Sequence, residues 1–237
     1  MLIDVHAHFY HPLSVRPDWS ERNASRLAAG ATIGIDWHVA SILGSWGRTS
    51  PTYFSSPEDQ RVANDALLGL IAETRSARGR IAGYVAVNPN FPALAESEID
   101  RCLAAGMIGI KLAASRRCND SGIDPIAEVA RRHRVPILQH IWQHRRREWP
   151  GQEASDAVEL VELALRYPTV AFILAHIGGG GDWLHSLHAV RHVPNVFVDL
   201  SGSGVDGGMV EACLGAVGTG RLLWGADLTL CTGLAKL

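Results

Sequence analysis

Histidine and aspartate residues that can bind a divalent metal recur along this chain where short apolar segments end. The pair His6 and His8 follows the apolar segment 2–5. Because side chains of an extended segment alternate with a period of two, both imidazoles point to the same side. Neutral imidazole and carboxylate are good ligands for Zn²⁺ and neighbouring first-row metals. A single His-x-His pair is weak evidence in a chain with 11 histidines.

Further residues of the same kinds stand at the ends of later apolar segments. His140, His176 and Asp227 each close a segment of their own, and Lys111 closes another. Catalytic side chains of parallel α/β barrels lie at the C-terminal ends of the strands. The combination of the pair with these residues therefore predicts a metal site.

The elements that would position these residues alternate between strands and helices. The expected strands are 2–5, 39–43, 81–87, 108–112, 135–139, 170–175, 196–200 and 222–224. Apolar residues at helical spacing predict helices over 57–78, 92–104, 124–133, 153–166, 182–192 and 208–217. The stretch between the first two strands is interpreted as a long polar loop rich in Trp, Arg and Asn. Because the chain stops soon after the eighth strand, the last helix is expected to be short or incomplete.

This alternation predicts an α/β fold with a parallel sheet. Eight strands, several of them apolar on both faces, favour closure into a (β/α)8 TIM-like barrel over an open, doubly wound sheet. The chain has 237 residues, and such barrels span about 250 residues as one unit. We therefore expect one barrel domain over residues 1–237.

Composition limits the partners and the compartment. Charged residues make up 19% of the chain and the formal net charge is -2, which argues against a nucleic acid or an anionic membrane as a partner. The four cysteines form no Cys-x-x-Cys pair, a pattern that fits reduced thiols and a cytoplasmic location. Asp4 and His6 interrupt the apolar N-terminus, so neither a signal peptide nor a membrane span is expected there.

Several motifs resemble those of a known family. Residues 3–9, Ile-Asp-Val-His-Ala-His-Phe, resemble the N-terminal signature of amidohydrolases. The stretches 137–140, 174–179 and 223–227 resemble the later strand-end motifs of that superfamily, and the Gly-Ile-Lys-Leu stretch at 109–112 is similar too. The most similar branch contains aminocarboxymuconate-semialdehyde decarboxylase and aromatic-acid decarboxylases, beside hydrolases of lactones. The resemblance spans nearly the whole chain and is specific for the fold and the metal site, but not for the substrate.

The resemblance implies a role for each member of the set. The residues that it assigns to one divalent metal, with zinc first and manganese as the alternative, are His6, His8, His140 and Asp227. His176 would stand beside the metal-bound water as acid or base, and a metal brings the pKa of such water to about 7. Asp227 is an alternative acceptor of that proton. Dimers are common in this branch, so the resemblance allows a homodimer, but the sequence does not fix the oligomeric state.

Lys111 leaves the number of metal ions open. In binuclear amidohydrolases a carboxylated lysine at the end of the fourth strand bridges two ions, and His176 would then bind the second. In the branch that this chain resembles, the site holds one ion, and we favour that reading. The structural alternative for Lys111 is an ion pair inside the barrel mouth, with Asp199 as its partner.

Two residues after the second strand are candidates for substrate binding, together with Lys111. Arg48 is suited to the bidentate capture of a carboxylate, and Trp46 can supply an apolar wall. Packing of the loop explains both residues equally well. The expected partner is therefore a small-molecule substrate, which can carry a carboxylate.

Three functions follow from these residues. The first is hydrolysis of an amide, ester or lactone bond of a small molecule by a metal-activated water. The alternative is decarboxylation of an aromatic or unsaturated carboxylic acid, whose carboxylate the metal and a cation such as Arg48 would hold. A third possibility is a barrel that binds a ligand without catalysis, but such a barrel has no need of the complete ligand set.

Overall fold

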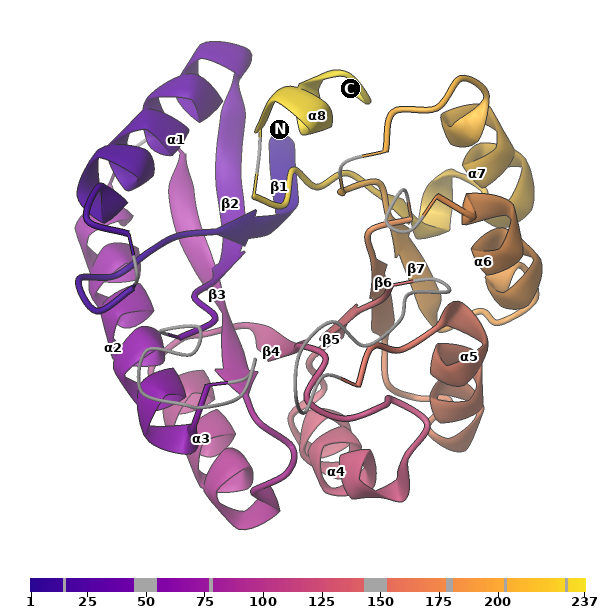
Figure 1. The fold of residues 1–237 in the computed structure, drawn as a ribbon, viewed down its shortest axis with the longest axis horizontal. Helices are drawn as coiled ribbons and strands as arrows, with labels where there is room; N and C mark the ends of the chain where they lie inside the picture. The colour runs from indigo at the N-terminus through magenta and orange to yellow at the C-terminus, as the bar shows by residue number, and fades with distance from the viewer. Residues whose placement is uncertain are drawn as a thin grey trace.

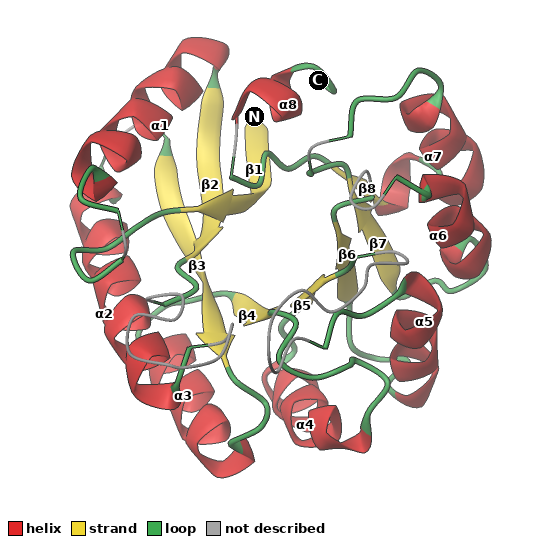
Figure 2. Ribbon diagram, viewed as in Figure 1, coloured by secondary structure: helices red, strands yellow, loops and turns green. Residues whose placement is uncertain are grey.

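The computed structural model describes residues 1–14, 16–44, 55–76, 79–142, 153–177, 181–202, 204–228 and 230–237. Eight parallel strands follow one another around a barrel in sequence order, and the helices surround them (Figures 1 and 2). The strands are β1 Leu2–His8, β2 Ile35–Ser41, β3 Arg80–Val87, β4 Gly109–Leu112, β5 Ile137–His140, β6 Phe172–Ala175, β7 Val196–Asp199 and β8 Leu222–Leu223. The predicted (β/α)8 barrel is confirmed.

The helices of the described residues alternate with these strands. They are α1 Trp19–Ile33, α2 Pro57–Thr74, α3 Pro92–Ala104, α4 Asp124–His133, α5 Ala157–Arg166, α6 Trp183–Val190, α7 Met209–Val217 and α8 Leu230–Leu234, with short 3₁₀ turns at Ser121–Ile123 and Thr219–Arg221. None of the described helices combines the length and the apolar character that crossing a membrane requires.

The stretch between the first two strands was interpreted from the sequence as a polar loop, but the structure contains helix α1 there. Its buried residues are Asn23, Arg26 and Gly30, so the inward face carries no row of large apolar side chains. The polar residues face inward because the backbone gives them partners. The Asn23 side chain, for example, exchanges two hydrogen bonds of 2.9 Å with the backbone of Tyr10. Apolar periodicity, the main sequence signal of a helix, is therefore missing from α1.

Capping residues explain where two helices begin. Ser56 precedes Pro57, and its side chain forms a reciprocal capping box with Asp59 at the start of α2. Asp156 forms the same motif with Glu159. For this reason α5 begins at Ala157 and not at residue 153 as predicted.

The barrel closes between β8 and β1 through a few backbone contacts. The Val5 amide donates to the Trp224 carbonyl at 3.0 Å, and the Asp227 amide donates to the His6 carbonyl at 2.7 Å. Helix α8 lies beside the start of β1 (Figure 1), and the Trp224 indole donates to the Gly233 carbonyl of α8 at 2.9 Å. The short last helix thus packs over this closure.

An apolar layer fills the barrel below the strand ends. Its buried members are Val39, Tyr84, Leu138, Ile173 and Ala175. His140 lies two residues after Leu138 on β5, so both side chains face the interior of the barrel. The strands thus carry apolar side chains in the middle of the barrel and polar ones at its C-terminal end.

Strand β1 reaches this level through an irregularity. It pairs with β2 as Asp4 with His38, but as Ala7 with Ala40, so the register shifts by one residue between Asp4 and Ala7. Such a shift turns the following side chains to the other face. Asp4 can therefore contact α1, while His6 and His8 point into the barrel.

Candidate metal centre

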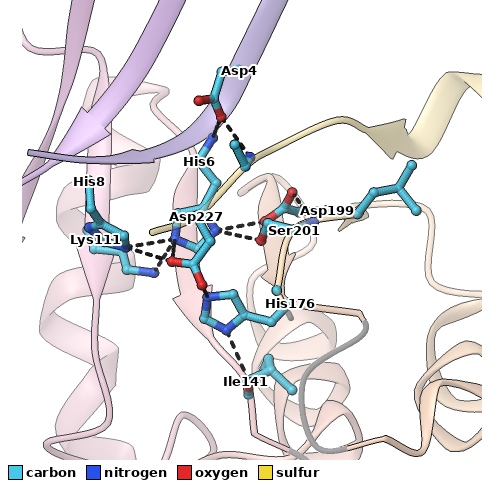
Figure 3. A network of polar contacts seen from close by, with 12 residues as sticks. Asp4, His6, His8, Lys111, Ile141, His176, Asp199, Ser201 and Asp227 are labelled. Carbon is cyan, nitrogen blue, oxygen red and sulfur yellow. Dashed lines mark hydrogen bonds and ion pairs between the residues drawn. The ribbon is translucent and has the colours of Figure 1, made fainter. Parts of the chain in front are cut away.

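Predicted metal-binding and catalytic residues from distant parts of the chain meet at the C-terminal mouth of the barrel (Figure 3). One ligand atom from each of His6, His176 and Asp227 lies within 4.8 Å of the other two. His8 belongs to the same cluster, since its Nε2 lies 3.2 Å from His6 Nε2 and 3.3 Å from Asp227 Oδ1.

The outer ring nitrogens of the β1 pair are held by hydrogen-bond acceptors. His6 Nδ1 lies 2.8 Å from Asp199 Oδ2 and 3.0 Å from Ser201 Oγ. His8 Nδ1 lies 3.2 Å from the carbonyl oxygen and 3.2 Å from the hydroxyl of Ser41. Protons on both Nδ1 atoms satisfy these acceptors and leave both Nε2 lone pairs on the inner side of the cluster. Metal-binding histidines typically have such a partner on the second nitrogen.

Burial keeps these imidazoles neutral. It lowers the pKa of His6 and His140 well below the ordinary value of 6.5, and it also lowers the pKa of His8. Nearby cationic groups, Lys111 among them, act in the same direction. Because a metal ion binds the neutral imidazole, the cluster is prepared for a ligand role near pH 7.

His140 supplies the evidence for a missing partner. Its ring centroid lies 4.6 Å from that of His176 and 5.7 Å from that of Trp142. Its Nε2 atom is buried and has no hydrogen-bond partner among the described residues. Buried polar atoms are rarely left without a partner, so an electron-pair acceptor at the centre of the cluster would account for this nitrogen.

His176 and Asp227 adopt an unusual backbone conformation. Their φ angles are 63° and 55°, in the left-handed region that costs non-glycine residues free energy. His176 Nε2 faces Asp227 Oδ2 at 3.4 Å. Burial alone would raise the pKa of Asp227, but the neighbouring His176 imidazole holds it well below the usual range. The carboxylate is therefore ionised.

These residues fit a divalent cation. Neutral histidines and one ionised carboxylate form the ligand set that first-row metals and zinc prefer. Asp227 supplies a negative charge within reach of three Nε2 atoms. The assignment of the individual ligands and of His176 as the acid or base stays a prediction.

Lys111 lies inside the cluster and not at its edge. Its Nζ atom is 3.2 Å from His6 Nε2, and the residue is 1% exposed. Burial lowers the pKa of Lys111 to about 8, although Asp227 and Asp199 act to raise it. The anticipated ion pair with Asp199 is not formed between these two described residues, because Asp199 contacts His6 and Ser201 instead.

Groups that support the ligands were missed or given another role from the sequence, where Asp199 was named only as a partner for Lys111. Burial raises the pKa of Asp199 to about 6, so this carboxyl is mostly ionised at neutral pH and accepts a hydrogen bond from His6. A side chain at Gly225 would collide with Asp199 Oδ1 and would lie 2.9 Å from His6 Cβ. Glycine at that position therefore permits the contact between His6 and Asp199. Arg26, from the helix that was not predicted, carried no recognisable signal.

Two predicted substrate-binding residues have no described structure. Trp46 and Arg48 both fall within 45–54, outside the described residues. Their roles stay predictions.

Comparisons with known proteins place this geometry in a family. The family model described as amidohydrolase matches residues 3–235. No match was found among curated protein sequences. Among solved structures, 2,6-dihydroxybenzoate decarboxylase from Rhizobium is similar, with a TM-score of 0.72 and 18% identity over 99% of this chain and 92% of that one.

Two further decarboxylases have the same fold. The dihydroxybenzoic acid decarboxylase from Polaromonas sp. JS666, with bound manganese and 2-nitroresorcinol, gives a TM-score of 0.69 and 18% identity over 99% of this chain and 90% of that one. The 5-carboxyvanillate decarboxylase from Sphingomonas paucimobilis gives 0.69 and 16% over 98% and 91%. At such identities the likeness establishes the fold alone. With the family match over almost its whole length, the chain belongs to the amidohydrolase family and is an enzyme of that superfamily.

Proposed function

We propose that this chain is a metal-dependent decarboxylase of a small aromatic or unsaturated carboxylic acid. The observation that carries the proposal is its similarity to three decarboxylases over 98% or more of its length, combined with the cluster of imidazoles and a carboxylate at the barrel mouth. Decarboxylation was the second choice of the sequence analysis, behind hydrolysis.

One divalent ion is proposed for the site, held by His6, His8, His140 and Asp227. The sequence analysis favoured zinc, and the bound manganese of the Polaromonas relative supports testing that metal equally. When bound, the ion supplies a Lewis acid that attracts and polarises oxygen atoms of the substrate.

The residues around this position can orient the acid and supply a proton. The Lys111 ammonium, with a pKa of about 8, is mostly charged at pH 7 and can face the substrate carboxylate. When the carbon–carbon bond breaks and CO₂ leaves, the electron pair of that bond stays on the substrate carbon that carried the carboxylate. This carbon must then take up a proton. His176, held 3.4 Å from Asp227 Oδ2, is the proposed donor, because imidazole exchanges protons near neutral pH.

Hydrolysis is the second candidate, and one contact favours it. The His176 and Asp227 side chains face each other, and such a pair can also take a proton from an attacking water. The two reactions differ in the product, since only decarboxylation releases CO₂.

A product assay separates the two candidates. Purified protein, loaded with zinc or with manganese, is incubated with 2,6-dihydroxybenzoate, 5-carboxyvanillate and a set of small lactones and aryl esters. We expect CO₂ release from an acid, and release about 10²- to 10⁴-fold slower from the His176→Ala variant. Hydrolysis of a lactone or an ester without any release of CO₂ would overturn the proposal in favour of the second candidate.

A further inference from the structure

The side chain of Arg26 connects helix α1 to the backbone of a proposed metal ligand. Its Nη1 donates to the Asp227 carbonyl at 2.7 Å and lies 3.4 Å from the Leu228 carbonyl. Its Nη2 donates to Asp4 Oδ2 at 2.9 Å. Arg26 is 8% exposed and Asp4 is fully buried, so this is a buried, charge-assisted network and not a surface ion pair.

Asp4 extends the network to both sides of the barrel closure. Its Oδ1 accepts the His6 amide at 3.2 Å and the Ala226 amide at 2.9 Å. Its Oδ2 also faces His38 Nδ1 at 3.3 Å. One carboxylate thus joins the backbone of His6 to the backbone of Ala226, the residue before Asp227. Figure 3 shows the contact between Asp4 and His6.

The backbone of Asp227 needs such support. Its φ of 55° lies in the left-handed region, which aspartate enters more readily than most residues but still at a cost in free energy. Its amide is fixed by the His6 carbonyl at 2.7 Å, and its carbonyl is fixed by Arg26 at 2.7 Å. Both sides of the strained residue are therefore anchored, and the direction of its carboxylate follows from the backbone that carries it.

We infer that Arg26, together with Asp4, is a positioning device that holds Asp227 in its left-handed conformation and so sets the affinity of the metal site. This inference rests on the proposed metal site. Arg26 would not contact the substrate or the metal, because its guanidinium is bonded to the main-chain carbonyl of Asp227 and not to the carboxylate.

A matched control distinguishes positioning from general stabilisation. Arg221 also donates to main-chain carbonyls, those of Val190, Val193 and Val196, at 2.8 to 3.2 Å. It precedes β8 and binds the carbonyls around the start of β7, at the opposite end of the strands from the site. Arg26→Met and Arg221→Met both remove a guanidinium that holds backbone carbonyls, but only the first removes one that holds a proposed ligand.

The experiment measures metal affinity and unfolding temperature for the wild type and both variants. Dissociation constants for Zn²⁺ and Mn²⁺ are obtained by competition with a chelating dye. Loss of groups that orient metal ligands typically weakens binding about 10- to 100-fold, and we expect that loss for Arg26→Met. For Arg221→Met we expect a lower unfolding temperature and an affinity within about twofold of the wild type.

A second measurement uses the metal-free protein. Hydrogen exchange of a peptide covering 224–228 reports the Asp227 amide, which is bonded to the His6 carbonyl. We expect faster exchange in this peptide for Arg26→Met and an unchanged rate for Arg221→Met. If Arg26→Met does not fold, Arg26→Lys replaces it, because lysine keeps the cation beside Asp4 but cannot donate in two directions from one planar group.

Two results would overturn the inference. A folded Arg26 variant with wild-type metal affinity is one, and an equal loss of affinity in both arginine variants is the other. Neither result would contradict the proposed function. That proposal fails if the wild type binds no metal or releases no CO₂.

Discussion

The mouth of the barrel and the apolar layer below it are formed by the same strands but differ in the polarity and the backbone strain of their residues. In the layer, Val39, Leu138 and Ile173 pack against each other without polar contacts. Two residues further along β5, the Nε2 atom of His140 is buried without a hydrogen-bond partner among the described residues. The mouth also contains two non-glycine residues with positive φ. The layer is built for packing. The mouth instead contains a buried nitrogen that a bound group would satisfy, and backbone strain that contacts such as those of Arg26 hold in place.

Asp227→Ala should give the largest functional effect at the mouth. The variant loses the one proposed ligand that carries a negative charge, so metal retention should fail. Activity should drop by at least about a thousandfold. Circular dichroism should show an intact barrel. A variant that keeps both metal and activity would remove Asp227 from the site.

His176→Ala should separate chemistry from metal binding. Loss of a general acid or base typically costs about 10²- to 10⁴-fold in rate. With a single-ion site, elemental analysis should find the metal content of the wild type unchanged. Loss of metal in this variant would instead support a second ion bound by His176 and Lys111.

Ile173→Ala tests the apolar layer in the same way. Truncation of a buried isoleucine costs about 2–5 kcal/mol of stability, which denaturant unfolding measures. Because the side chain lies below the mouth, metal content should stay at the wild-type value. If this variant loses the metal as readily as Asp227→Ala, metal binding at the mouth depends on the packing of the apolar layer, contrary to our description.

The pH dependence of stability should come from the mouth. Burial lowers the native pKa of three imidazoles below 6.5, so the unfolded chain binds more protons than the native one below that pH. Stability of the metal-free protein should therefore fall as the pH drops below 6.5, by up to about 1.4 kcal/mol per pH unit for each imidazole. Urea unfolding at several pH values measures the slope. The prediction would be contradicted if the free energy of unfolding stayed constant between pH 5 and 6.5 in the wild type and the His140→Gln variant gave the same profile.

The layer was easier to predict from sequence than the mouth and its supports. Strands such as Ile81–Val87 carry runs of apolar and β-branched residues, and this local pattern survives in the fold. The strand-end positions of His140 and His176 were readable for the same reason. Helix α1 was missed because its inward face is polar, and Arg26 takes its partners from Asp4 and Asp227, residues that only the closed barrel brings near.

The number of metal ions per chain tests the central claim most directly. Elemental analysis of protein purified without chelators should find about one zinc or manganese per chain, and His140→Gln should lower this number. Two ions per chain would contradict a single site and make Lys111 and His176 ligands. No metal, with none bound after addition of zinc or manganese, would contradict the metal centre itself.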